Sequence, residues 1–177
     1  MDAHMLDEQF ASGGDDVLAE AIALYGQPLL RYCHHILCDY HDAQDAVQTT
    51  FIKAYDNRKR FRAGTSLSAW LYRLAYTTCI DALRRRKLQL FTPPPAAPDP
   101  DYIGDDLRRA LETLSPEQRA LVYGRVIEQR SFDALAVIYG KPAATLRKRY
   151  ERARRKLAQA LEGTPAERRR RGYESHT

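Results

Sequence analysis

Apolar residues recur at helical spacing along most of the chain, and the alternation expected of strands is nearly absent. The spacing predicts an all-α protein with roughly four helices, a linker and four more helices. The expected helices cover 17–25, 27–39, 42–55, 66–87, 105–114, 116–128 and 131–140, followed by a basic helix within 141–157.

Polar residues and prolines that favour helix ends support these limits. Pro28 is tolerable in a first helical turn, and Asp42 is a suitable N-cap. Ser66 or Ser68 can cap the long helix that follows, and the Ser-Pro pair at 115–116 is a helix start signal.

The last predicted helix is basic on one side and apolar on the other. Between Lys141 and Lys156 the chain has eight Lys or Arg and one acid, Glu151. The short predicted helix before it is hydrophobic on one face and ends at Gly140. These are the parts of a helix-turn-helix, whose second helix enters the DNA major groove. A solvated basic surface is the alternative interpretation. The apolar side contains Leu146, Tyr150, Ala153 and Leu157, and the opposite side Lys148, Arg152 and Arg155.

The net charge of +5 is concentrated in the C-terminal half of the chain. Residues 1–90 contain eleven acidic and eleven basic residues, whereas 105–162 contain eight acidic and thirteen basic residues. This distribution favours contact between the C-terminal half and phosphate. No apolar run approaches the roughly 20 residues that span a bilayer, and no signal-peptide pattern is found. Three cysteines give no disulfide framework, so we expect a cytoplasmic protein without membrane insertion.

A proline-rich segment divides the chain near its middle. Residues 91–100 contain five of the nine prolines, so a regular helix cannot persist there. We expect an extended linker between two separate helical domains, with a long surface loop inside one domain as the alternative. The predicted divisions are an N-terminal tail at 1–15, a domain at 16–90, the linker at 91–104, a second domain at 105–162 and a basic tail at 163–177.

The segment 61–76 has the chemistry of a site for unpaired bases. Its first part is an exposed loop that mixes Arg62 and Gly64 with hydroxyl side chains, and aromatic residues beside arginine follow on a helix. Unpaired or flipped bases stack on aromatic faces while arginine and hydroxyl groups hold phosphates. Trp70 and the neighbouring tyrosines fit a helical core equally well, so both interpretations remain open here.

Several motifs in both halves of the chain share the sequence pattern of one known family. The segments DAQDAVQTTFIKAY (42–55), SAWLYRLA (68–75) and DALRR (81–85) resemble region two of the extracytoplasmic-function sigma factors of the sigma-70 family. The segments LSPEQR (114–119), SFDALA (131–136) and RARRKL (152–157), together with Gly140, are similar to region four. The resemblance covers about 17–162 in the right order. It implies two helical domains that bind bacterial core RNA polymerase and direct it to promoters.

The resemblance also implies roles for individual residues. The polar face of 42–55 would bind the largest polymerase subunit, the loop 61–69 would capture a base flipped from the minus-ten element, and the following helix would lie along the melting junction. The start of the basic helix would read the minus-thirty-five element in duplex DNA. The implied polymerase residues are Asp42, Asp45, Gln48 and Thr49; the minus-ten residues are Phe61, Arg62, Thr65, Ser66, Trp70, Arg73, Tyr76, Thr77 and Arg84; the minus-thirty-five residues are Ala144, Thr145, Arg147, Lys148 and Arg149, with Arg152, Arg154 and Arg155 on phosphates.

Three positions depart from the family pattern. Thr49 stands where members usually have Glu, which alters the polymerase contact that the resemblance implies there. Thr77 replaces an Asn that is common in the melting helix, which changes the base contacts that the resemblance implies there. The recognition helix opens with ATLRKR (144–149) in place of the usual GTVKSR, which indicates an atypical minus-thirty-five sequence. Whether an anti-sigma factor holds the protein inactive is open, although members of the family often have one.

Other functions fit the sequence less well. A DNA-binding regulator that uses the helix-turn-helix without polymerase is the main alternative, and a helical protein-binding adaptor is a second. The chain has no phosphate-binding glycine loop, nucleophile elbow or metal-ligand set, so we expect neither an enzyme nor a cofactor. Cys33 and Cys38 are five residues apart and point to different helix faces, so we expect no metal, although His34, His35 and His41 lie nearby.

Overall fold

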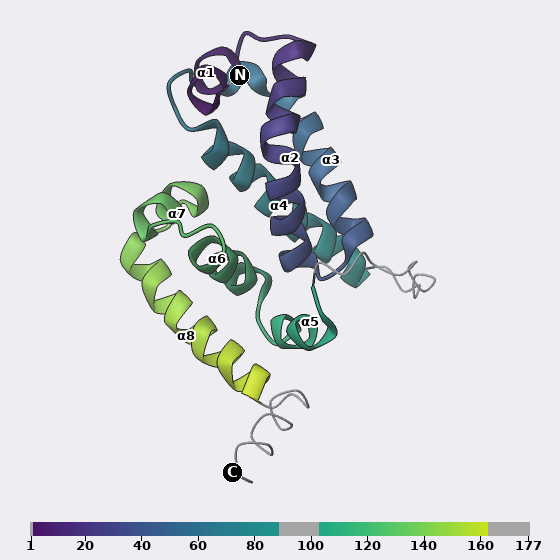
Figure 1. The fold of residues 1–177 in the computed structure, drawn as a ribbon, viewed down its shortest axis with the longest axis vertical. Helices are drawn as coiled ribbons and strands as arrows, with labels where there is room; N and C mark the ends of the chain where they lie inside the picture. The colour runs from purple at the N-terminus through teal and green to yellow at the C-terminus, as the bar shows by residue number, and fades with distance from the viewer. Residues whose placement is uncertain (1, 89–102, 163–177) are drawn as a thin grey trace, which may run out of the picture.

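The computed structural model describes residues 2–88 and 103–162, and within these ranges the protein is all-α, as predicted (Figure 1). The expected linker and C-terminal tail, apart from residues 103 and 104, lie outside the described ranges. The first group of elements comprises α1 (Ala3–Gln9), α2 (Asp15–Leu37), α3 (Tyr40–Asp56), the 3-10 turn η1 (Arg58–Arg60) and α4 (Leu67–Leu88); the second comprises α5 (Asp105–Glu112), α6 (Pro116–Val126), α7 (Phe132–Tyr139) and α8 (Ala143–Glu162).

The first residues form a helix where we expected a tail. α1 begins after Asp2, whose carboxylate accepts a hydrogen bond from the N–H of Met5 at 2.9 Å. Leu6 and Phe10 are 0% and 2% exposed and belong to the main core. A helix of this length is not stable alone, because nucleation costs more than a few hydrogen bonds return. Packing on the rest of the domain therefore creates α1, and local sequence alone does not reveal it.

A single helix, α2, replaces the two helices expected over 17–25 and 27–39. Pro28 lies inside it, where the ring removes a backbone hydrogen bond at a cost of about 3 kcal/mol. Tyr25, Leu29 and Tyr32 lie on the buried side of the same helix. Burying each of these large side chains stabilises by about 1.5–3 kcal/mol, which is enough to carry the helix through the proline.

Polar caps set the starts of α3 and α4. The carboxylate of Asp39, and not of Asp42 as expected, accepts the capping hydrogen bond, which comes from the N–H of Asp42 at 2.9 Å. The hydroxyl of Ser66, one of the two expected caps, accepts from the N–H of Ala69 at 3.1 Å. Any acidic or hydroxyl side chain near a helix start can serve as its N-cap, so sequence alone does not decide which of several neighbouring residues does so.

The second group contains the predicted helix-turn-helix. Ser115 and Gln118 form a capping box at the start of α6, with proline in the first turn. The hydroxyl of Ser131 caps α7, and Gly140 ends it with a φ of 62°. The turn then leads into α8, which packs against α6, α7 and α5 and lies on the outer side of the group (Figure 1).

The two groups are packed against each other, contrary to the expectation of separate bodies. Helix α2 contacts α6, and α4 contacts α7. Leu121 and Leu135 of the second group belong to the same buried cluster as Leu29 and Leu71 of the first. A smaller cluster holds α5 and α6 against α8. Apolar and aromatic residues of α2 and α4 pack both on the first group and on the second group, so these two helices contribute to both.

We predict opposite effects for the same methyl group at two glycines. Gly140→Ala lowers the free energy of unfolding by about 1 kcal/mol, because Ala is strained at a positive φ while the nearest atom leaves room for it at 3.8 Å. Gly26→Ala raises it by about 0.5–1 kcal/mol, since its methyl meets only Ile22 at 3.7 Å inside a helix. Urea unfolding followed by circular dichroism measures both. Equal effects of the same sign would contradict this account of the turn.

Candidate nucleic-acid interface

Helix α8 has one buried side and one exposed basic side, as predicted. Leu146 and Ala153 are 1% and 0% exposed, whereas Lys148, Arg152 and Arg155 are exposed. Within its bounds α8 contains seven Lys or Arg and two Glu. A helix whose apolar side is packed on its own domain and whose cationic side is exposed is suited to contact the phosphates and base edges of a major groove.

The first turns of α8 contain the predicted minus-thirty-five residues in two different settings. Ala144, Arg147 and Lys148 are exposed, and Thr145 is half-buried. Arg149 forms an ion pair with the carboxylate of Glu117 on α6. Its side chain therefore has a structural contact in addition to the DNA contact that we predicted. The guanidinium of Arg147 also lies 5.1 Å from the centre of the Phe132 ring, which steadies it beside α7.

Glu117 of α6 holds two cations of the helix-turn-helix. Its Oε1 lies 2.6 Å from Nζ of Lys141 and 2.5 Å from Nη1 of Arg149. Partial burial alone would raise the pKa of Glu117, but the two cations outweigh it and the pKa is lowered. The carboxylate is therefore charged at neutral pH and ties the turn and the start of α8 to α6.

The loop 61–66 presents a small exposed surface on an ordered turn. Arg62, Thr65 and Ser66 are exposed, and the Thr65 hydroxyl donates to the carbonyl of Arg62 at 2.7 Å. Phe61, which we expected in the loop surface, is 5% exposed and packs on Trp70 with ring centres 5.3 Å apart. Phe61 therefore supports the loop from inside, and it does not face a ligand in this conformation.

The aromatic residues of α4 are engaged inside the protein in this conformation. The Trp70 ring also meets Phe10 of α1 at 6.0 Å, and the Tyr76 ring meets Tyr139 of α7 at 5.1 Å. Tyr72 is 2% exposed. The structure thus favours the core interpretation for these rings as they stand. Exposed polar groups along the same helix remain accessible, namely Arg73, Thr77 and Arg84.

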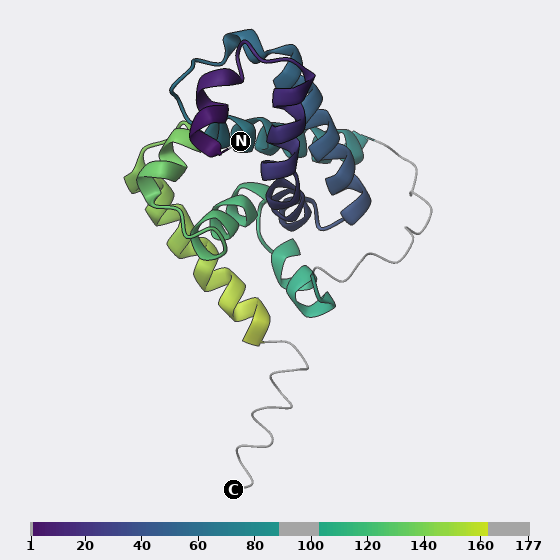
Figure 2. The same ribbon diagram turned by 45° about the horizontal axis from the view of Figure 1, so that its top comes forward.

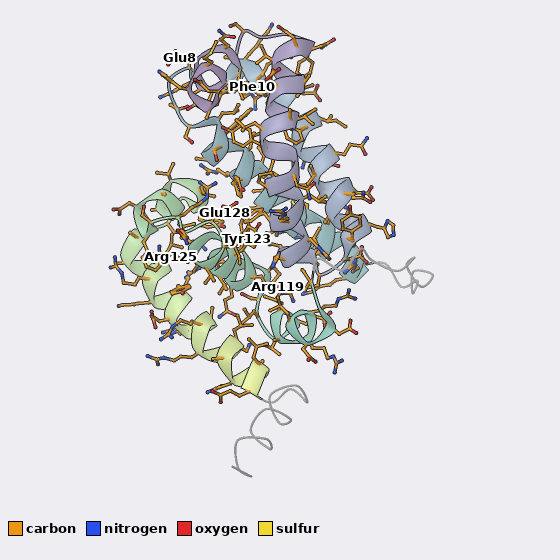
Figure 3. The ribbon with its side chains drawn as sticks, in the orientation of Figure 1. Glu8, Phe10, Arg119, Tyr123, Arg125 and Glu128 are labelled. Atoms are coloured by element: carbon orange, nitrogen blue, oxygen red, sulfur yellow. The ribbon has the colours of Figure 1, made fainter. Side chains whose placement is uncertain are left out.

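Tyrosine hydroxyls join the two groups of helices. Tyr32 and Tyr139 share a hydrogen bond at 2.8 Å between their hydroxyls. The Tyr72 hydroxyl donates to Glu128, which also pairs with Arg130 at 2.7 Å. Burial is the main cause that raises the pKa values of Tyr72 and Tyr139, so both phenols are protonated. Figure 3 shows Glu128 and Tyr123 at the boundary between α6 and α2.

Two arginines of the second group extend this contact. The Arg130 guanidinium lies 4.3 Å from the centre of the Tyr72 ring, and its Nη2 donates to the Ser68 hydroxyl at 3.1 Å. Nη1 of Arg119 donates to the carbonyl of Ile36 near the end of α2 at 2.6 Å. Sequence reasoning missed these residues, because the contact joins positions about sixty or more apart that no local pattern relates.

The predicted polymerase face of α3 borders an apolar groove between α2 and α3. The groove has a volume of about 500 Å³, and Ile22 and Ile52 on it are 45% and 55% exposed. Gln48 lines the groove, whereas Asp45 is exposed beside it on α3. Exposed apolar surface of this kind is typical of protein–protein contacts, membrane contacts and ligand-binding grooves. Leu18, Ile22, Leu30, Val47, Phe51 and Ile52 supply most of its apolar lining.

The remaining predicted polymerase residues are less available. Asp42 is half-buried and forms an ion pair with Arg86 at the end of α4, and Arg86 also lies 3.6 Å from Asp39. Thr49 is half-buried. Asp42 therefore joins the start of α3 to the end of α4, a contact that its position in a first helical turn did not reveal. Sequence reasoning also missed the groove, although the apolar residues Ile22 and Ile52 could have indicated it.

The cysteine and histidine residues considered for metal lie in the helical core or at its edge. Cys33 and Cys38 are buried thiols, and His34 is 1% exposed. Across residues 2–88 and 103–162 no cluster of three or more His, Cys, Asp or Glu is arranged to hold a metal ion. Within the same ranges no helix is both long and apolar enough to cross a membrane.

Comparison with known proteins identifies the two halves. The family described as "Sigma-70 region 2" matches residues 21–89, and the family described as "Sigma-70, region 4" matches residues 104–157. The sigma factor SigW of Bacillus subtilis is 24% identical over 175 residues, covering 87% of this chain and 94% of SigW. SigM of Mycobacterium tuberculosis is 33% identical over 131 residues, covering 68% of this chain and 64% of SigM.

Solved structures agree on the fold. CnrH, solved in complex with the cytosolic domain of CnrY, matches with a TM-score of 0.70 at 22% identity, covering 90% of this chain and 97% of CnrH. RpoE of Bartonella quintana, solved with the anti-sigma factor NepR, matches with a TM-score of 0.68 at 24% identity, over 82% of this chain and 96% of RpoE.

The fold and the two matches define a two-domain transcription initiation factor. The chain belongs to the extracytoplasmic-function sigma factors of the sigma-70 family. It is an alternative sigma factor that directs transcription initiation, and, as members of this family are not enzymes, the sequence prediction holds on that point too. A region 2 match ahead of the helix-turn-helix also sets aside the regulator that acts without polymerase.

We predict that a charge at the tyrosine contact separates the two domains. Tyr139→Glu places a carboxylate between Tyr32 and Tyr76, where burial of an unpaired charge is costly. The radius of gyration from small-angle X-ray scattering should rise while the helical circular dichroism signal stays. Val137→Glu is the control, because it adds the same charge to α7 at a side chain that is 66% exposed. An unchanged radius for a folded Tyr139→Glu protein would contradict the contact.

Proposed function

We propose that this sigma factor reads the minus-thirty-five element with the first turns of α8. The observation that carries the proposal is the exposed basic side of α8, opposite a stripe buried against α6 and α7. Ala144, Thr145, Arg147 and Lys148 would face base edges, and Arg149 would contribute from its ion pair with Glu117. Arg152 and Arg155, further along the same side, would hold phosphates, which fixes register without reading sequence.

The minus-ten element would be bound by the loop 61–66 and the exposed side of α4. Arg62, Thr65 and Ser66 supply donors and acceptors for a flipped base and its phosphates. Arg73, Thr77 and Arg84 continue along α4 and would follow the melted strand. Phe61, Trp70 and Tyr76 would support this surface, and Trp70 and Tyr76 would meet bases only after the packing around them opens.

Core polymerase would bind at α3 and the groove beside it. The groove offers an apolar surface of the kind that buries protein side chains, and Asp45 and Gln48 provide polar groups at its margin. Thr49 lies on the same helix and would contribute at the edge of this contact. Asp42 would act indirectly, because its ion pair with Arg86 fixes the start of α3.

The two domains would separate when polymerase and promoter bind. Tyr76 packs on Tyr139, and Tyr72 and Ser68 are bonded to the 128–130 turn, so region 4 covers part of the minus-ten surface in the compact form. A protein that binds the compact form would hold the sigma factor inactive by population shift. Because two structural relatives were solved with CnrY and with an anti-sigma factor, an anti-sigma partner in the cytoplasm fits this chain.

We predict that promoter use and polymerase binding can be lost separately. Arg147→Ala or Lys148→Ala should lower transcription from the cognate promoter by about tenfold and leave polymerase affinity unchanged, since a good base contact is worth about 1–3 kcal/mol. Asp45→Arg combined with Gln48→Ala should instead weaken binding to core polymerase. Fluorescence anisotropy with purified core enzyme and transcription in vitro from the promoter of the protein's own gene give the two readouts.

Arg109→Ala is the matched control, because it removes an exposed cation from α5, away from the basic side of α8. It should change neither readout. Equal loss of both activities in every variant would contradict the division of labour between the domains. No transcript with the wild-type protein, together with tight binding of duplex DNA by the protein alone, would contradict the proposed promoter contacts.

A further inference from the structure

Helix α1 fixes the loop between η1 and α4 at two points. The backbone carbonyl of Asp7 accepts a hydrogen bond from the N–H of Gly64 at 3.1 Å. The carboxylate Oδ1 of Asp7 accepts a second one from the N–H of Leu67 at 2.7 Å. The loop passes beside α1 in both views (Figure 1 and Figure 2). One residue of α1 therefore holds both the turn of the loop and the first residue of α4.

The bond to Leu67 caps α4 from another helix. The first N–H groups of a helix have no partner within it, and a carboxylate there is favoured by the helix dipole. Ser66 caps the same end through the N–H of Ala69. α4 thus begins with one cap from its own chain segment and one from α1, and the second depends on a residue sixty positions away.

Phe10 supports the same loop from inside. Its ring lies 6.0 Å from the rings of both Phe61 and Trp70, edge-on to each. Phe10 and Phe61 are 2% and 5% exposed, so this contact is dry. Figure 3 labels Phe10, directly after α1 at this end of the domain, and Glu8 of α1. The loop is therefore held by the carbonyl and the carboxylate of Asp7, and it packs on the aromatic rings of Phe10 and Trp70.

Between these anchors the loop is exposed and tightly turned. Gly64 has a φ of 77°, a conformation that other residues adopt only with strain. Thr65 and Ser66 are exposed between the two anchored N–H groups of Gly64 and Leu67. A loop ordered before binding loses less entropy when it takes up a ligand, which raises affinity without any new contact.

We propose that α1 preorganises this loop for base capture and that Asp7 is a positioning residue for recognition of the minus-ten element. Asp7 acts through Gly64 and Leu67 and does not itself touch DNA. The inference rests on the proposed function, in which the loop 61–66 binds a flipped base. α1 lies before the segment 21–89 that matches sigma-70 region 2, so the family match does not assign it this role.

The test uses four variants, which separate the loss of the Asp7 hydrogen bond from the loss of charge and from the loss of stability. Asp7→Ala removes the carboxylate that caps α4, whereas Asp7→Asn keeps an oxygen that can accept from the N–H of Leu67. Asp2→Asn removes one negative charge from the same helix, and its amide oxygen still caps the N–H of Met5. Phe10→Leu, a fourth variant, removes the aromatic support while keeping the site apolar.

The measurement is binding of the complex with core polymerase to a fork-junction probe from the protein's own promoter. One base of the unpaired strand at a time is replaced by an abasic site. With the wild-type protein, the abasic site at one position should lower the affinity more than at any other, and that position marks the captured base. Asp7→Ala should reduce the ratio of the affinity for the intact probe to the affinity for this abasic probe by about tenfold. A loss of this size is typical of one hydrogen bond. Asp7→Asn and Asp2→Asn should stay within about threefold of wild type.

Each outcome decides between two claims. One result is an affinity ratio that depends on position in the wild-type protein and stays unchanged in both Asp7→Ala and Phe10→Leu. That result would overturn the role of α1 and leave the loop as the minus-ten site. The absence of any such position with the wild-type protein would overturn the proposed base capture, and the role of α1 with it. Polymerase affinity and the unfolding midpoint are measured alongside. If Asp7→Ala does not fold, the ratio for Phe10→Leu decides the matter, and a wild-type ratio there overturns the proposal.

Discussion

The burial of one face of α2 against both halves of the protein is the constraint on which the rest of the structure depends. Tyr32 is 0% exposed; its ring lies 4.8 Å from that of Tyr72 and 5.7 Å from that of Tyr123, and its hydroxyl bonds to Tyr139. The first neighbour belongs to region 2 and the other two to region 4. A single helix therefore sets the position of the helix-turn-helix relative to the proposed minus-ten surface.

This arrangement leaves the two proposed DNA-binding surfaces in different states. The basic side of α8 is exposed, because α8 turns its apolar stripe to its own domain. The tyrosines of α4 are covered, because α7 and the 128–130 turn lie on them. Opening the contact exposes aromatic surface and breaks the hydrogen bonds from Tyr72 to Glu128 and from Arg130 to Ser68. Under the proposed function, the binding energy of polymerase and promoter offsets that cost.

Sequence reasoning succeeded where the determining forces are local. The start signal at Ser115, the glycine that ends α7 and the two-sided pattern of α8 all act within a few residues, and all were predicted. It failed where distant segments decide the outcome. α1 depends on a surface supplied by the rest of region 2, the intact α2 depends on burial around Pro28, and Asp42 is drawn to Arg86 from forty-four residues away. The contact between the domains has no local signal, so separate domains were expected.

The distance between the two domains, measured in the free protein and in a functioning complex, tests this account most directly. Arg60→Cys and Lys156→Cys place exposed labelling sites on η1 and α8, and the three native thiols are buried. Single-molecule energy transfer between dyes at these sites should report one short distance in the free protein. A longer distance should appear when core polymerase binds and the complex transcribes. An unchanged short distance in transcribing complexes would contradict the claim that the domains must separate.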